Sequence, residues 1–398
     1  GWNVHNEKFF EGLKGVINHL KLSANVGATG KASFEAYEAQ DVYEYYKGQW
    51  YAGGLGVIMN NMGNTNLQWE KTHTFDGNFE IQFLNGLVSA NINYYVKTTK
   101  DLLADITLPP SSGFESYRDN LGELENKGYE ISLRGFLVRD KDLVVNVFGS
   151  IAHNKNVIKK ISNSLETYNK KVDDEQDNYE PGWGEAMETA KPQVQFKEGQ
   201  STTAIYAVRS LGIDPMTGEE LFLTKEGKPT WIWNALDKIV VGDTEPKIRG
   251  TFGVNVGWKG LYMNATFAYQ YGGEAYNQTV VDKVENSNKY QNVDKRVLTE
   301  TWQKPGDVVK YKANVTSRLV QYFTYASSRF VQDLNYLQFS SFSLQYEMPK
   351  NWISCLRMES LRFSFNMSDL FYWSTVKRER GTSYPFARSF TVGLRANF

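Results

Sequence analysis

The side chains able to do chemistry are few in this chain of 398 residues, and they do not form a recognisable catalytic set. The four histidines, His5, His19, His73 and His153, show neither an H-E-x-x-H motif nor the i, i+4 spacing that places two imidazoles on one face of a helix. No P-loop, dinucleotide-binding glycine motif or G-x-S-x-G elbow is present. The sequence therefore predicts no catalytic residue, no metal site and no cofactor.

Carboxylates and the single cysteine offer little more. A glycosidase needs two carboxyl groups that flank the scissile bond. Asp173, Asp174, Glu175 and Asp177 form an acidic cluster, but the surrounding stretch is rich in Lys and Asn, which favours a solvated loop face. The lone Cys355 excludes an internal disulfide and a cysteine-ligated zinc site, and is typical of a small buried residue. An enzyme such as a β-rich glycosidase remains a rival hypothesis without a carboxylate pair to nominate.

Three aromatic residues in the same polar stretch are candidates for substrate contact. Tyr168, Tyr179 and Trp183 have the flat, amphipathic rings that stack on sugars or pack against peptide side chains. The same rings also suit packing of the loop onto itself. Both interpretations stay open from the sequence alone.

Composition and hydropathy narrow the class of protein. The chain has 44 basic and 45 acidic residues, so charge gives no reason to expect nucleic acid as a partner. The mean hydropathy is −0.49, and no apolar run reaches the roughly 18 residues of a membrane-spanning helix. Membrane β-strands are not excluded, because their alternating residues average to an unremarkable hydropathy.

The elements that must position any site are strands, as strict alternation of apolar and polar residues indicates. In 72–83, Phe75, Phe79 and Ile81 fall on one face, while the residues between them are polar. The next segment, 88–97, repeats the pattern, and Asn85-Gly86 between them is typical of a tight hairpin turn. Further alternating segments lie at 20–28, 128–138, 143–153, 252–258, 261–271, 361–367 and 390–398.

Connection lengths differ systematically along the chain. Tight turns are predicted near 85, 140 and 259, whereas 99–128, 154–200 and 274–328 are long and polar. Outer-membrane barrels have short periplasmic turns and long extracellular loops. The architecture of a soluble sandwich does not require all long loops to lie at one end of the strands. The pattern thus favours an all-β fold, an antiparallel transmembrane β-barrel.

The polar faces of the predicted strands support a hydrated lumen. They carry Asp76, Glu80, Arg134, Arg362 and Arg395, which is too much charge for a dry protein core. The alternative is a soluble or surface-exposed all-β module with its apolar stripe inward, which would bind glycans through aromatic loop residues.

Several stretches, in order along the whole chain, resemble the SusC-like TonB-dependent transporters of the Bacteroidetes outer membrane. NLGELENKGYEISL at 120–133 resembles the strand entry that TonB-dependent receptors share. The other stretches that resemble the family are 1–10, 64–80, 93–103, 210–222, 240–253, 301–308, 334–353 and 383–398. The alternating strand that ends at Phe398 also resembles the terminal aromatic signal read by the barrel-assembly machinery of Gram-negative bacteria.

The resemblance implies an importer in the Gram-negative outer membrane. Its family has a 22-stranded barrel filled by an N-terminal plug, and a SusD-like surface lipoprotein acts as a lid. TonB pulls on the plug to release bulky oligosaccharides or peptides inward. The implied partners are therefore the SusD-like lipoprotein, TonB, membrane lipid, and the plug and remaining strands.

The strand count predicts only part of such a barrel. About ten to twelve strands are recognisable in this chain, roughly half of a wall that must close in lipid because unpaired strand edges are costly there. We find no linker that divides the chain, so 1–398 is expected to be one unit, the C-terminal portion of the barrel. A plug domain and a TonB box are not recognisable, which predicts a fragment or a cleaved product.

Overall fold

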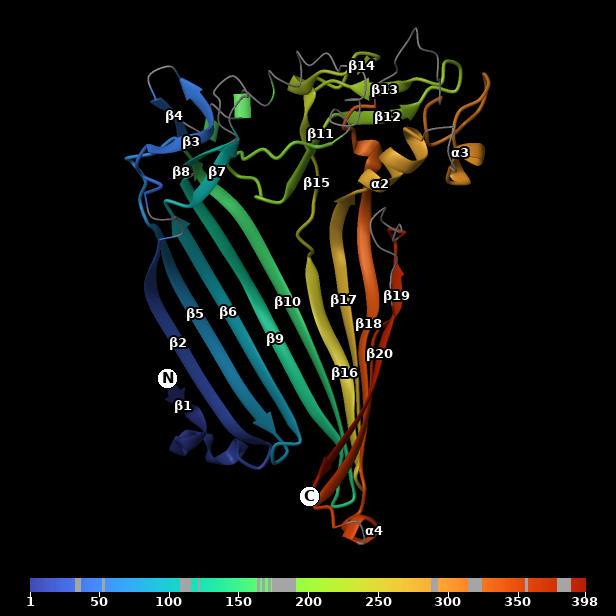
Figure 1. Cartoon of the computed structure of the whole chain (residues 1–398). Helices are drawn as coiled ribbons and strands as arrows, with labels where there is room; N and C mark the ends of the chain where they lie inside the picture. Colours follow the sequence, from blue (N-terminus) through green and yellow to red (C-terminus); the bar gives the residue numbers. More distant parts are fainter. Residues whose placement is uncertain are drawn as a thin grey trace.

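A computed structural model describes residues 1–32, 37–51, 54–107, 116–120, 122–162, 165–166, 169–170, 173, 191–287, 293–313, 324–354, 357–377 and 388–398. One curved sheet dominates this part of the chain (Figure 1). Among the helices described, none has the length and hydropathy needed to cross a membrane.

The main sheet has eleven strands, which lie side by side in the order of the sequence. Every neighbouring pair is antiparallel, as expected when each strand returns beside the last. The count confirms the ten to twelve strands expected from alternation. The strands are β1 (Trp2–Asn3), β2 (Ile17–Lys31), β5 (Glu70–Phe83), β6 (Val88–Lys100), β9 (Gly122–Arg139), β10 (Leu143–Ile161), β16 (Ile248–Trp258), β17 (Leu261–Tyr276), β18 (Val331–Glu347), β19 (Ser360–Ser374) and β20 (Ser389–Asn397).

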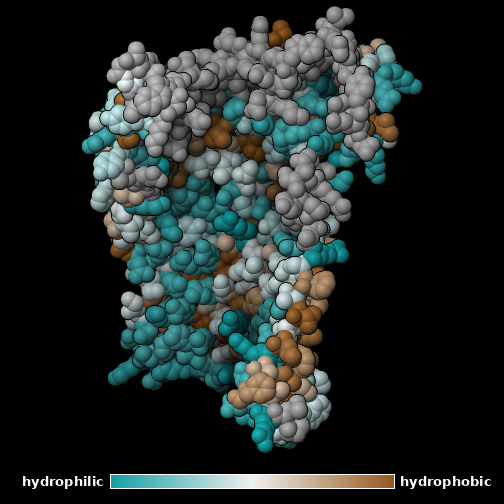
Figure 2. Space-filling view, in the orientation of Figure 1, coloured by the Kyte–Doolittle hydropathy of each residue, from teal (hydrophilic) through white to brown (hydrophobic). Residues whose placement is uncertain are grey.

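The two faces of the sheet differ in polarity. Residues directly opposite each other in neighbouring strands lie on the same face, and the paired residues are of the same kind. Phe79 of β5 pairs with Ile92 of β6, and Asn78 pairs with Asn93. Phe79 is 51% exposed, so the apolar face does not pack on a core. Figure 2 shows hydrophilic side chains over the part of the sheet formed by β2, β5 and β6, and hydrophobic ones along β19 and β20.

Short turns and long connections lie at opposite ends of the sheet (Figure 1). The predicted turns near 85, 140 and 259 are confirmed. In the four-residue turn between Phe83 and Val88, Leu84, Asn85 and Gly86 have positive φ, at 51°, 57° and 77°, a backbone region that asparagine and glycine tolerate well. A longer turn, which contains helix α4 (Lys350–Ile353), joins β18 to β19 at the same end.

The long connections cover 32–69, 101–121, 162–247, 277–330 and 375–388. Three of them match the predicted loops in place, but their bounds differ. Strand β10 continues to Ile161, and the connection that follows extends to 247 instead of 200. The sequence pattern missed this length because much of 201–247 folds into short strands of its own.

The described parts of these connections form small sheets and short helices above the end of the wall (Figure 1). We call this assembly the cap. Its strands are β3 (Val42–Tyr51), β4 (Gly54–Asn61), β7 (Leu103–Thr107), β8 (Ser116–Asn120), β11 (Ala204–Ala207), β12 (Arg209–Ile213), β13 (Glu220–Leu223), β14 (Pro229–Thr230) and β15 (Ile239–Asp243). Its helices are η4 (Ala235–Asp237), α2 (Gln278–Val280), η5 (Val281–Glu285), α3 (Arg296–Thr299) and η6 (Ser328–Phe330). Two short helices, η1 (Val4–Asn6) and η2 (Lys8–Leu13), lie at the other end.

The buried hydrophobic cluster found in the described residues lies where the cap joins the wall. Val280, Val281 and Val284 pack there with Tyr311 and Phe330. These residues follow β17 and precede β18, so they fix two cap segments to the ends of two wall strands. The wall itself is held mainly by its backbone ladders.

Candidate functional site: the polar inner face

A continuous row of amide and hydroxyl side chains crosses the polar face of the wall. Asn255 of β16 donates its side-chain amide to the side-chain oxygen of Asn146 on β10 at 2.9 Å. Asn264 of β17 donates in the same way to Asn255 at 2.6 Å. The row continues through the register pairs of β18, β19 and β20. We call this row the amide ladder, and its members are Asn146, Asn255, Asn264, Ser343, Asn366 and Thr391.

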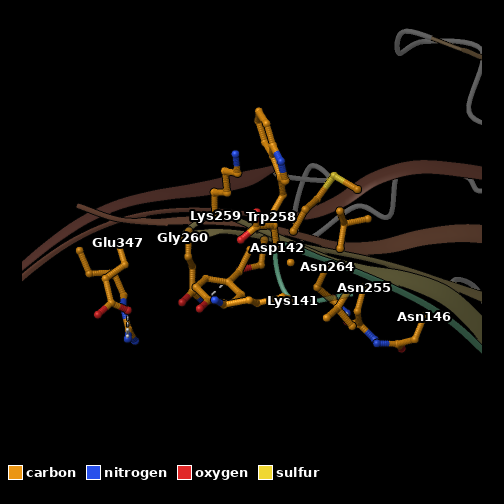
Figure 3. Close-up of a pocket in the computed structure, with 17 residues that line it drawn as sticks. Lys141, Asp142, Asn146, Asn255, Trp258, Lys259, Gly260, Asn264 and Glu347 are labelled. Atoms are coloured by element: carbon orange, nitrogen blue, oxygen red, sulfur yellow. Dashed lines mark hydrogen bonds and ion pairs between the residues drawn. The ribbon is translucent and has the colours of Figure 1, made fainter. Parts of the chain in front are cut away.

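A hollow of about 750 Å³ lies over the ladder near the short turns (Figure 3). In the close-up, Asn146, Asn255 and Asn264 point to one side of the sheet, and Trp258 points to the other. The side chain of Arg362 donates to Glu347 at 3.1 Å at the edge of the hollow. The concave side is thus polar, and the aromatic ring belongs to the opposite face.

A second hollow, of about 540 Å³, lies on the polar face of β2, β5, β6 and β9. Its lining includes three carboxylates, Asp76, Glu80 and Glu130, set among asparagines. Nζ of Lys21 lies 3.4 Å from Glu80. This arrangement agrees with the charged lumen expected from the strand pattern.

Two histidines meet beside this surface, which the sequence pattern did not indicate. The ring centroids of His5 and His19 lie 4.4 Å apart, and Nε2 of His19 lies 3.9 Å from Glu80. They meet because β1 pairs with β2 and so brings η1, which carries His5, beside His19. The alternation within each strand gives no sign of this contact. No group of three metal-ligating side chains occurs within the described ranges.

One residue of the predicted acidic cluster, Asp173, is partly buried in the cap. Oδ1 of Asp173 lies 2.7 Å from Nζ of Lys238, whose side chain is 2% exposed, and Asp173 also accepts from Gln195. Burial lowers the pKa of the Lys238 ammonium, and the nearby Asp173 acts against that shift. The predicted solvated loop face was therefore wrong for Asp173, because the connection folds back over it. Asp174, Glu175 and Asp177 lie outside the described residues.

Comparison with known proteins shows which protein family the wall resembles. The family model described as "TonB dependent receptor-like, beta-barrel" matches residues 15–208, which include all strands from β2 to β11. The chain thus resembles TonB-dependent receptor β-barrels. Its predicted resemblance to SusC-like transporters is confirmed by its relatives and by solved structures.

Two curated relatives and one solved structure illustrate the match. TonB-dependent receptor P3 of Formosa agariphila is 25% identical over 100% of this chain and 41% of its own length. TonB-dependent receptor SusC of Bacteroides thetaiotaomicron is 23% identical over 88% of this chain and 34% of its own length. The RagAB peptide importer in its closed-closed state superimposes with a TM-score of 0.77 at 21% identity, over 100% of this chain and 42% of that one. The chain spans about two fifths of the length of these proteins or less.

The protein is located in the outer membrane, as predicted. Outer-membrane barrels turn their short connections to the periplasm and their long ones to the outside, so the cap lies on the extracellular side. The polar face that carries the amide ladder lines the lumen, and the apolar face that carries Phe79 is the outer face.

The substrate-contact candidates remain predictions. Tyr168, Tyr179 and Trp183 all lie outside the described residues. Phe398 follows β20 and is 79% exposed, and its role as a barrel-assembly signal also stays a prediction. The polar face of the strands was predicted correctly, but the amide ladder needed the register between strands, which a single sequence does not contain.

Proposed function

We propose that this chain forms part of the wall and cap of an importer that takes up bulky nutrients, oligosaccharides or peptides, across the outer membrane. The amide ladder carries this proposal. Amide and hydroxyl groups both donate and accept hydrogen bonds, so they suit solutes that are rich in hydroxyl or peptide groups. They bind such solutes weakly in a hydrated lumen, which allows release.

The partners follow from the same proposal. A SusD-like lipoprotein would dock on the extracellular side, where the cap lies. TonB would act through a plug that the rest of the barrel encloses, and membrane lipid would contact the outer face. The chemistry is binding and passage, because this surface presents amides and hydroxyls without an activated nucleophile.

Gene deletion tests the proposal directly. Cells with and without the gene are grown on defined oligosaccharides and on peptide mixtures, and loss of each compound from the medium is followed by mass spectrometry. We expect one class of compound to remain in the medium of the deletion strain. Complementation should restore its uptake. A protonophore should block the restored uptake if TonB drives it. Equal uptake of every compound by the two strains would refute the import role.

Purification tests the proposed partner separately. The native protein, extracted in mild detergent through an affinity tag, is expected to carry a surface lipoprotein in near-equal amount. If the tagged protein is recovered without a lipoprotein while import is intact, the lipoprotein is not a partner. The proposed import function would be unaffected.

A further inference from the structure

A buried ionic group joins two cap segments that are distant in the sequence. Nη2 of Arg329 donates to Oε2 of Glu220 at 2.8 Å and to Oε1 of Glu285 at 2.7 Å. Nη1 of Arg329 donates to Oε2 of Glu285 at 2.5 Å. Glu220 belongs to the connection between β10 and β16, whereas Glu285 and Arg329 belong to the one between β17 and β18.

Water has little access to this group. The side chains of Arg329, Glu220 and Glu285 are 9%, 6% and 0% exposed, and the nearby Lys312 is 7% exposed as a residue. Two carboxylates and two cations are thus enclosed together. Removal of the Arg329 charge would leave Glu220 and Glu285 buried without their ion-pair partner, which is far more costly than the loss of a surface pair.

Further contacts orient Glu220 and Arg329. The hydroxyl of Ser327 donates to Oε1 of Glu220 at 2.6 Å, so the carboxylate has partners on both oxygens. The guanidinium of Arg329 also lies 4.3 Å from the ring centroid of Phe330, which belongs to the buried cluster at the wall. Such a fixed fork geometry is one that lysine cannot reproduce.

The group is tied directly to the wall. Arg329 lies in η6, which is followed at once by β18, and Glu285 lies in η5, which follows β17 and α2. The backbone of Asn277 donates to the carbonyl of Phe330 and so holds these two ends together. The Glu220 segment is attached by the bond from Ser328 N to the carbonyl of Val208.

A separate set of contacts holds the other described part of the cap. The side chain of Asn64 donates to Oδ1 of Asp119 at 3.0 Å, and Arg118 lies 3.3 Å from Glu38. These bonds join connection 32–69 to connection 101–121. Connections 32–69 and 101–121 are thus held to each other by contacts that do not involve Arg329.

We propose that Arg329 is a positioning residue that makes the segments 204–247 and 277–330 one rigid half of the cap, seated on β17 and β18. The inference rests on the proposed import function, in which this half would present a fixed surface to the solute and the lipoprotein. The fork of Arg329 sets the relative position of the two segments. A movement of either segment is then transmitted to the other.

Hydrogen exchange followed by mass spectrometry tests this proposal on the native protein in detergent. In Arg329→Met, exchange should rise by about tenfold or more both in 209–230 and in 277–287, because buried charges lose their partner. Arg362→Met removes a half-exposed pair at the periplasmic end and should change neither segment. An Arg329→Met protein with unchanged exchange in 209–230 would overturn the proposal.

Glu220→Gln gives a second, milder test that does not depend on tolerance of Arg329→Met. It weakens the contact of residue 220 with Arg329 and keeps the Arg329–Glu285 ion pair. Exchange should therefore rise in 209–230 and stay unchanged in 277–287. A rise in both segments, or in neither, would contradict the assigned coupling. Because exchange is measured without transport, these outcomes stand whether or not the import function is correct.

Discussion

The side-chain amide of Asn264 donates to the side-chain oxygen of Asn255 at 2.6 Å across β17 and β16. Asn255 donates in turn to Asn146, so the same chemical group is repeated from strand to strand along the lumen. A repeated group of this kind lets a polar solute exchange one hydrogen-bond partner for an equivalent one as it moves.

Replacement of Asn255 by Leu should reduce uptake of the transported nutrient by about two- to fivefold, since one typical hydrogen-bonding contact contributes about 1 kcal/mol. The folded barrel should remain, because water replaces the lost bonds in a hydrated lumen. Uptake of labelled nutrient and the heat resistance of the folded band on a gel report the two quantities. Val254→Leu, on the outer face of the same strand, is the matched control. Equal uptake by both variants would show that the ladder has no part in passage.

The neighbouring residues Asn78 and Phe79 test which face meets lipid. Phe79→Arg should destabilise the inserted barrel by about 2–4 kcal/mol if the residue lies near the membrane midplane, whereas Asn78→Arg should be tolerated. The amount of folded protein in isolated outer membranes distinguishes the two variants. Loss of the Asn78→Arg protein with survival of the Phe79→Arg protein would reverse the assignment of the faces.

The turn between β16 and β17 depends on Gly260, whose φ is +87°. A Cβ there would lie 2.7 Å from the carbonyl oxygen of Glu347, so Gly260→Ala combines backbone strain with a clash. We expect a loss of about 1–3 kcal/mol, seen as a lower unfolding temperature in detergent. Gly257→Ala should be nearly neutral, because its Cβ would meet Tyr262 at an ordinary 3.6 Å. Equal unfolding temperatures for the two variants would argue against this geometry.

Lys312 should make the cap more stable at alkaline pH. Burial lowers its pKa from 10.5 to about 8, although Glu285 and Glu220 act in the opposite direction. Between these two values the unfolded cap binds more protons than the folded cap, so this group's contribution to stability rises with pH. Exchange protection of 296–313, corrected for the intrinsic rate, should therefore increase from pH 7.5 to 9.5. The increase should be lost in Lys312→Met, and its persistence there would assign it to another group.

The wall was predictable because its signal is local. Alternation such as that of Phe75 and Phe79 needs only neighbouring residues, and Asn85-Gly86 marks a turn through its own backbone preference. The short turns also placed β5 beside β6, β9 beside β10 and β16 beside β17.

The cap was not predictable in the same way. Arg329 and Glu220 are far apart in the sequence, and neither has a neighbour that signals the pairing. Asp173 was read as solvated because its surroundings are charged, yet Lys238 covers it after the chain folds back. Burial of paired charges depends on tertiary contacts, so a single sequence gives no pattern for it.

An outer-membrane barrel requires that the wall separate lipid from a water-filled lumen. Spin labels placed singly at positions 75 to 81 of β5, in the native outer membrane, measure access of oxygen from lipid and of a nickel chelate from water. We predict a period of two, with oxygen favoured at Phe75, Phe79 and Ile81, and the nickel chelate favoured at Asp76, Asn78 and Glu80. Equal access of the nickel chelate to both sets of positions would contradict an outer-membrane barrel.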